Sequence, residues 1–152
     1  MELFKKISEL KANNDFEGLV ELVPYAKTIG IETSLVGDNI VSTLPFLSSN
    51  IGNHAIPALH GGAVAGFMEN AAIFHLMWTA KLQQMPKVID FSIDYLRSGQ
   101  ATTSYSQCEI IRLGRRVALC NIKVWQADID KPFALARAHF LLSSNEPFNK
   151  ES

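Results

Sequence analysis

Residues 60–80, HGGAVAGFMENAAIFHLMWTA, largely determine the fold of this chain. The stretch is built mainly of Ala, Val, Phe, Met, Ile, Leu and Trp, and it predicts a helix over about 61–81 that is apolar on nearly all sides. Such a helix has to be covered by other parts of the structure all round. Three polar residues near its middle, Glu69, Asn70 and His75, favour a buried core helix over a membrane span.

Strand patterns lie on both sides of this helix. Upstream, IETSLVGDNIVSTLPF (residues 31–46) predicts two strands around a Gly-Asp-Asn turn, followed by a Ser-, Asn-, Gly- and Pro-rich loop. Downstream, alternating patterns predict four strands of an antiparallel meander, at residues 88–97, 102–114, 116–128 and 132–144. The first of these should place one set of side chains on a common face: Ile89, Phe91, Ile93 and Tyr95.

The N-terminal segment, residues 1–29, is predicted to be a helical extension. Residues 2–13 have apolar side chains at helical spacing, and a second helix is expected from Phe16 to Val23, ending near Pro24. With no repeat, low-complexity run or linker, residues 1–152 are interpreted as one α+β domain in which a sheet curls around the apolar helix. A sheet covers only part of that helix, so either residues 1–30 or a partner chain must cover the rest. The tail, residues 146–152, is expected to be frayed.

Composition excludes several classes of protein. The 152 residues are 47% hydrophobic and 19% charged, which is typical of one globular domain. A net charge of −1 gives no basic excess for nucleic acid or an anionic membrane. Cys108 and Cys120 lie in apolar stretches and are interpreted as buried free thiols; without a CxxC or an i,i+4 histidine pair, no metal site is expected. The N-terminus has no continuous apolar run, so we expect no signal peptide and a cytoplasmic protein.

Glu69 is the only carboxylate between His60 and Lys81. A charge in such an apolar helix is costly unless it is paired or used in chemistry. The alternative is a Glu that faces solvent or meets an arginine from another strand, and the helix alone leaves both interpretations open.

Two glycines begin the helix. Gly61 and Gly62 let another molecule approach the first backbone amides, which have no intrahelical acceptor and lie at the positive end of the helix dipole. This arrangement can stabilise the oxyanion formed when a carbonyl is attacked, although a flexible helix start explains a Gly-Gly pair equally well. Gly62 and Glu69 share a helix face but lie roughly 10 Å apart along the axis. If both are catalytic, Glu69 of one chain should complete the amide site of another, with Gly66 permitting close approach of two helices in a twofold oligomer.

These residues resemble a known signature. NHAIPALHGGAVAGFMENAA (residues 53–72) resembles the PaaI-like branch of the hot-dog-fold acyl-CoA thioesterases, in which an acidic residue follows the His of HGG by nine positions, as Glu69 follows His60. The stretches FSIDYLRSG, RLGRRVA and AHFLL also resemble this family, so the similarity covers about residues 30–144. The resemblance implies a hot-dog fold, a homodimer or homotetramer, hydrolysis of acyl-CoA, and no cofactor beyond the coenzyme A of the substrate.

The resemblance also implies roles for individual residues. Glu69 would activate water or attack directly, and the Gly62 amide would hold the thioester oxygen. His60 and Asn53 fall where relatives place residues that shape the site or position water. Many relatives have Asp in place of Glu69, and some have Ser or Thr near the position of Val88, so this chain departs from the pattern at two places.

Substrate contacts can also be assigned as expectations. Candidates for the coenzyme A phosphates are Arg97, Arg115 and Arg116, because arginine forks suit phosphate. We expect Phe67, Phe74 or Phe91 to line an acyl pocket, and we interpret His54 as a loop residue and His75 and His139 as structural. Two other functions remain: a hot-dog acyl-CoA hydratase or dehydratase, which would need His54 or His60 to face the acid, and a non-catalytic acyl-CoA-binding module.

Overall fold

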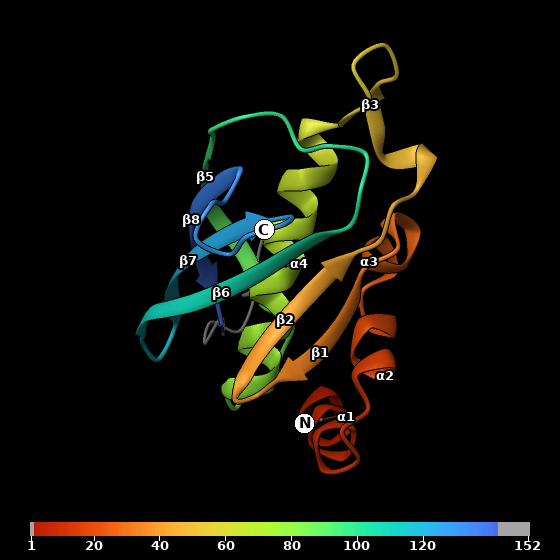
Figure 1. The fold of residues 1–152 in the computed structure, drawn as a ribbon. Helices are drawn as coiled ribbons and strands as arrows, with labels where there is room; N and C mark the ends of the chain where they lie inside the picture. Colours follow the sequence, from red (N-terminus) through yellow and green to blue (C-terminus); the bar gives the residue numbers. More distant parts are fainter. Residues whose placement is uncertain (1, 143–152) are drawn as a thin grey trace, which may run out of the picture.

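The computed structural model describes residues 2–142, and it confirms the predicted α+β architecture. A six-stranded antiparallel sheet with strand order β1-β2-β6-β7-β8-β5 curls around helix α4 (Gly61–Thr79), which crosses its concave face (Figure 1). The strands of this sheet are β1 (Glu32–Val36), β2 (Asn39–Leu44), β5 (Lys87–Tyr95), β6 (Ser104–Leu113), β7 (Val117–Trp125) and β8 (Ala134–Leu141).

Alternation along the strands decides which side chains meet α4. The inward residues of β7 and β8 are buried and include small side chains, which lets the helix approach the sheet closely: Ala118, Cys120, Ile122, Val124, Ala134, Ala136, Ala138 and Phe140. In β5 the alternation is interrupted, because a bulge lies between Val88 and Asp90. Ile89 is the extra residue and is 56% exposed, so the prediction that it shares the inner face with Phe91 and Ile93 is wrong.

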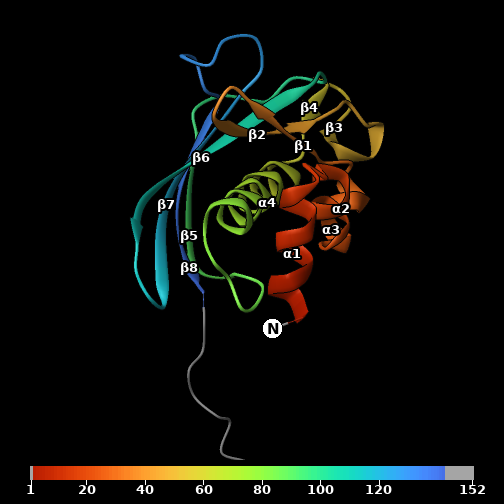
Figure 2. The same ribbon diagram turned by 90° about the horizontal axis from the view of Figure 1, so that it is seen from below.

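The N-terminal helices cover the side of α4 that the sheet leaves open (Figure 2). They are α1 (Glu2–Ala12), α2 (Phe16–Glu21) and α3 (Pro24–Ile29). Phe16 stacks on Trp78 of α4 with ring centroids 4.4 Å apart, and Leu19 is fully buried. This chain therefore provides much of the second layer itself. The third helix was not predicted, because Pro24 was interpreted as a stop, whereas it occupies the first turn of α3, where a missing N–H costs nothing.

The segment before α4, predicted to be a loop, contains ordered structure. A short 3-10 helix, η1 (Ser48–Asn50), leads into a two-stranded sheet of β3 (Ile51–Asn53) and β4 (Ala58–Leu59). Asn50 is 4% exposed, donates from Nδ2 to the Ile29 carbonyl at 2.8 Å, and accepts the His60 amide proton on its backbone oxygen at 2.8 Å. Asn50 thereby ties the end of α3 to His60, the residue immediately before α4.

Several expectations concern the chain as a whole. Cys108 and Cys120 are buried free cysteines, as predicted. Across residues 2–142, no helix is long and apolar enough to cross a membrane, and no group of three or more His, Cys, Asp or Glu side chains is placed to hold a metal ion. The predicted frayed tail, residues 146–152, lies outside the described residues.

Candidate functional site at the first turn of helix α4

His60 is the N-cap of α4 and holds its first turn. With φ −64° and ψ 128°, the residue is extended, and its Nδ1 accepts the Gly62 amide proton at 2.9 Å. An accepting Nδ1 carries no proton, so the proton of the imidazole ring is on Nε2. The predicted site residues His60 and Gly62 are therefore in direct contact. Gly62 can bind an oxyanion only when the His60 ring gives up this hydrogen bond.

The Gly61 amide differs from the Gly62 amide in its hydrogen bonding. In the part of the chain that the structure describes, no acceptor faces this N–H, because it lies in the first turn, where helices leave donors unpaired. Gly61 is exposed, and its carbonyl oxygen accepts a hydrogen bond from the Tyr95 hydroxyl at 2.6 Å. Tyr95, at the end of β5, was not predicted as a site residue. It was, however, the one polar member of the predicted apolar face of that strand.

The β3–β4 sheet packs against the same cap. A Cβ atom on Gly52 would lie 2.7 Å from the His60 Cα, so only glycine permits this approach between the two backbones. The neighbouring Asn53 is exposed, and its Oδ1 accepts the Ala55 amide proton at 3.0 Å, which fixes the turn after β3. Asn53 therefore lies at the end of the short strand that packs against His60, and its role in positioning water stays a prediction. Gly52 was missed by sequence reasoning.

Glu69 lies two turns further along α4 and is half-buried. Neither of the two ion pairs found among the described residues includes it, and no hydrogen bond from that part of the chain reaches its carboxylate. Desolvation raises the pKa of Glu69, because burial disfavours the charged form. Pairing with an arginine of the same chain, one of the alternatives to a functional role, is therefore not found among residues 2–142.

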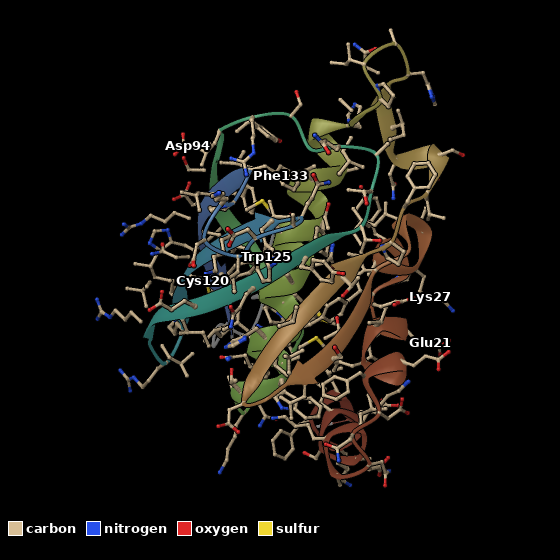
Figure 3. All side chains as sticks on the ribbon, in the orientation of Figure 1. Glu21, Lys27, Asp94, Cys120, Trp125 and Phe133 are labelled. Atoms are coloured by element: carbon tan, nitrogen blue, oxygen red, sulfur yellow. The ribbon has the colours of Figure 1, made fainter. Side chains whose placement is uncertain are left out.

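A cavity of about 360 Å³ opens beside the first turn. Gly61, Tyr95 and Arg97 line it together with Phe133, which is labelled in Figure 3. Arg97 is exposed, and its Nη2 donates to the Lys131 carbonyl, which ties the guanidinium to the loop before β8. Arg97 is thus the predicted phosphate ligand that lies near Gly61.

Arg115 and Arg116 lie far from this turn. The register Val117–Leu141–Lys87 places the β6–β7 turn at the start of β5, whereas Tyr95, at the other end of β5, contacts Gly61. Nine residues of β5 separate the two ends by about 27 Å. These arginines could meet a ligand at Gly61 only from another copy of the chain.

The remaining predicted residues lie on α4, except for Phe91 on β5. Phe67 and Phe74 are fully buried in the core, while Phe91 on β5 is half-buried. A Cβ atom on Gly66 would lie 2.8 Å from the Tyr25 ring, so this glycine faces α3 of its own chain. The role of the three phenylalanines in lining an acyl pocket stays a prediction.

A larger hollow of about 900 Å³ lies elsewhere and includes His75 and Cys108 in its lining. Burial lowers the pKa of His75, and its Nδ1 is buried without a hydrogen-bond partner among the described residues. The interpretation of His75 as a structural core or interface histidine stays a prediction, because an unpartnered Nδ1 within one chain is compatible with an interface. His139, by contrast, is paired with Asp90 at 3.1 Å on the outer face of the sheet.

Known proteins share the fold of this chain. Residues 57–133 match the sequence profile of the thioesterase superfamily. A crystal structure of a protein from Chromobacterium violaceum is 42% identical, with a TM-score of 0.75, and the match covers 93% of this chain and 99% of that one. A search of curated proteins found no match.

Two more distant structures have informative names. The PaaI protein of the Escherichia coli phenylacetic acid degradation operon is 21% identical, with a TM-score of 0.71, over 88% of this chain and 94% of that one. A Haemophilus influenzae thioesterase is 19% identical, with a TM-score of 0.73, over the same shares, 88% and 94%. At these identities the likeness concerns the fold, whereas the profile match and the 42% identical protein concern the family. The chain therefore belongs to the thioesterase superfamily and has the hot-dog fold of its PaaI-like members.

Proposed function

We propose that the protein hydrolyses acyl-CoA thioesters. The observation that carries this proposal is that one helix bears both Glu69, a half-buried carboxylate, and Gly61, whose amide lies in the first turn. Neither group has a hydrogen-bond or ion-pair partner among residues 2–142. Hydrolysis of a thioester requires a group that activates or replaces water and a donor that stabilises the oxyanion. The thiolate of coenzyme A leaves readily, so a strong general acid is not required.

The thioester oxygen is bound at the first turn. The Gly61 N–H is ready to donate, and the helix dipole adds positive potential at the same place. The Gly62 N–H joins it when the incoming oxygen displaces His60 Nδ1, which accepts that proton in the structure. His60 then has both ring nitrogens available in the site.

Glu69 is the catalytic carboxylate. Its pKa is raised by burial, which makes the carboxylate a stronger base than an exposed one and brings its titration closer to neutral pH. The same environment suits direct attack on the thioester, and kinetic detection of an acyl-enzyme would distinguish a nucleophile from a base.

The site is completed across a twofold dimer. Gly61 and Glu69 are eight positions apart, which is about 12 Å along the axis and too far to meet at one carbon atom. Glu69 of one chain therefore serves the first turn of another. β5 is a nine-residue strand at the edge of the sheet, and such an exposed edge is suited to pairing with a second copy. A dimer of dimers follows if further faces associate.

Arginines bind the phosphates of coenzyme A, and apolar residues bind the acyl group. Arg97 is placed near the first turn, and Arg115 and Arg116 reach a ligand from a partner chain. Phe91 borders the acyl group. Two free buried cysteines support a reducing compartment, the cytoplasm.

The test is release of free thiol from short, medium, long and aromatic acyl-CoAs by the wild type and by Glu69→Gln. Release by the wild type alone supports the proposal and reveals the acyl preference. Hydration of an enoyl-CoA without thiol release would favour the hydratase, and tight binding without turnover would favour a binding module.

A further inference from the structure

The Gly61–Gly62 peptide unit is hydrogen-bonded at both ends. Its carbonyl oxygen accepts from the Tyr95 hydroxyl at 2.6 Å, and its N–H donates to His60 Nδ1 at 2.9 Å. The oxygen and the N–H of one peptide unit are linked by resonance, so a donor on the oxygen makes the N–H a stronger donor. Tyr95, the peptide unit and His60 thus form one continuous chain of hydrogen bonds.

Tyr95 lies where it can act on this peptide without belonging to the core. Its side chain is 50% exposed and forms part of the wall of the cavity beside Gly61. A Cβ atom on Gly61 would lie 3.3 Å from the Tyr95 hydroxyl oxygen, so the ring rests against the glycine. The bond to Gly61 is the one hydrogen bond made by this hydroxyl within residues 2–142.

We propose that Tyr95 is a positioning residue for thioester hydrolysis, which orients the Gly62 amide and the His60 ring through the Gly61–Gly62 peptide unit. The inference rests on the proposed function, because it assigns this role within the same site. Tyr95 touches neither the thioester nor the attacking water. Its effect passes through the peptide unit, whose rotation would change the direction of the Gly62 N–H and release His60.

The state of the Tyr95 hydroxyl is compatible with this role. Desolvation raises the pKa of Tyr95, which keeps the phenol protonated, and therefore able to donate, throughout the neutral range. The Tyr95 hydroxyl must be the donor in this hydrogen bond, because the Gly61 carbonyl oxygen has no proton to donate.

The sequence offers a direct probe of this peptide unit, because Gly61–Gly62 is its single Gly-Gly pair. Protein labelled with carbonyl-¹³C glycine and ¹⁵N glycine gives one cross-peak in a spectrum that links a carbonyl to the following amide. In Tyr95→Phe we expect the Gly61 carbonyl to move upfield and the Gly62 amide to move with it. Tyr105→Phe, on the outer face of the sheet, should leave the peak in place. A cross-peak with unchanged chemical shifts in Tyr95→Phe overturns the proposal.

Kinetics separate positioning from a purely structural contact. Tyr95→Phe should lower kcat roughly 10-fold with little change in KM, as expected for loss of one neutral hydrogen bond that acts in the transition state. Fluorotyrosines at position 95 have more acidic phenols and donate more strongly, so kcat should rise along the series relative to Tyr95→Phe. A structural role would change the melting temperature and leave kcat independent of phenol acidity, which would overturn the inference.

The two proposals fail in different ways. If the wild type releases thiol, Glu69→Gln does not, and Tyr95→Phe equals the wild type, the role of Tyr95 is wrong and the proposed function stands. If the wild type releases no thiol from any acyl-CoA, both are wrong.

Discussion

His60 Nδ1 and the Gly62 amide are joined by a hydrogen bond of 2.9 Å, so one side chain both caps α4 and borders its first turn. The two roles can be separated by substitution. Asn is among the best N-cap residues and offers an oxygen where His60 offers Nδ1, whereas Ala offers nothing. We expect His60→Ala to lose about 1 kcal/mol of stability in urea unfolding and His60→Asn to lose little.

The catalytic activity of the two His60 variants should not parallel their stability. If the imidazole contributes to hydrolysis, both His60 variants should be slower than the wild type in the thiol-release assay. Full activity in His60→Asn would limit the role of His60 to helix capping.

The Gly61 amide can be removed without breaking the helix. Gly61 is the first residue of α4, and proline is tolerated there, because its N–H has no intrahelical acceptor. The ψ of His60, 128°, is already suited to a following proline. We expect Gly61→Pro to lower the rate at least ~10²-fold by removing an oxyanion donor.

Gly61→Ala is the matched control for this substitution. It adds a Cβ at the same place, 3.3 Å from the Tyr95 hydroxyl oxygen, but it keeps the N–H. Gly61→Ala should therefore retain most of the activity. Equal rates for the two variants would show that the Gly61 amide is not the donor and would move that role to Gly62.

Ionisation of Glu69 should destabilise the folded protein. Because its pKa is raised by burial, the folded state holds this proton more tightly than the unfolded state does. The stabilisation is fully present below the ordinary Glu pKa of about 4.3 and is lost as pH rises through the higher folded value. We therefore expect Glu69→Gln to be more stable than the wild type at pH 8, with the difference shrinking in acid, as measured by urea unfolding at fixed protein concentration.

The same variant tests catalysis. The rate of Glu69→Gln should fall at least ~10²-fold, while the acid limb of the wild-type pH profile marks ionisation of the carboxylate. Glu32→Gln, at an exposed position on β1, provides the control for removing a charge. A stability gain at pH 8 without loss of activity would place Glu69 in a purely structural role.

Complementation between chains tests whether Glu69 acts in trans. Gly61→Pro and Glu69→Gln should each be inactive alone. In a twofold dimer of the two, one site combines an intact first turn with an intact Glu69, so random mixing should restore roughly a quarter of the wild-type activity. If both groups act within one chain, no mixed dimer has a complete site, and activity stays at the level of the separate variants.

Much of the fold was predictable because its signals are local. The apolar run of α4 and the alternation in β6, β7 and β8 follow from periods of 3.6 and 2 residues. The bulge in β5 was not predictable, because Ile89 continues the alternation in sequence while the pairing with β8 skips it. The third helix, α3, was missed for a related reason, since a proline that ends one helix can also begin the next, as Pro24 does.

In the candidate site, the residues that could be predicted are unusual within a single element, α4. Glu69 is visible as a lone charge in an apolar helix, and Gly61–Gly62 as a pair that opens it. The contact of Tyr95 with Gly61 joins residues 34 positions apart and depends on how far the sheet curls around α4. The fit of Gly52 against His60 likewise depends on the β3–β4 pairing, which a loop-like composition concealed.

The order of elements has a consequence for synthesis of the protein. The apolar helix α4 leaves the ribosome before β5, β6, β7 and β8, the strands that later cover one side of it. Among residues 2–142, the one strand that pairs with β5 is β8, so the sheet closes after the last of its strands has emerged. A nascent chain halted before β8 therefore exposes α4 to other nascent chains and to chaperones.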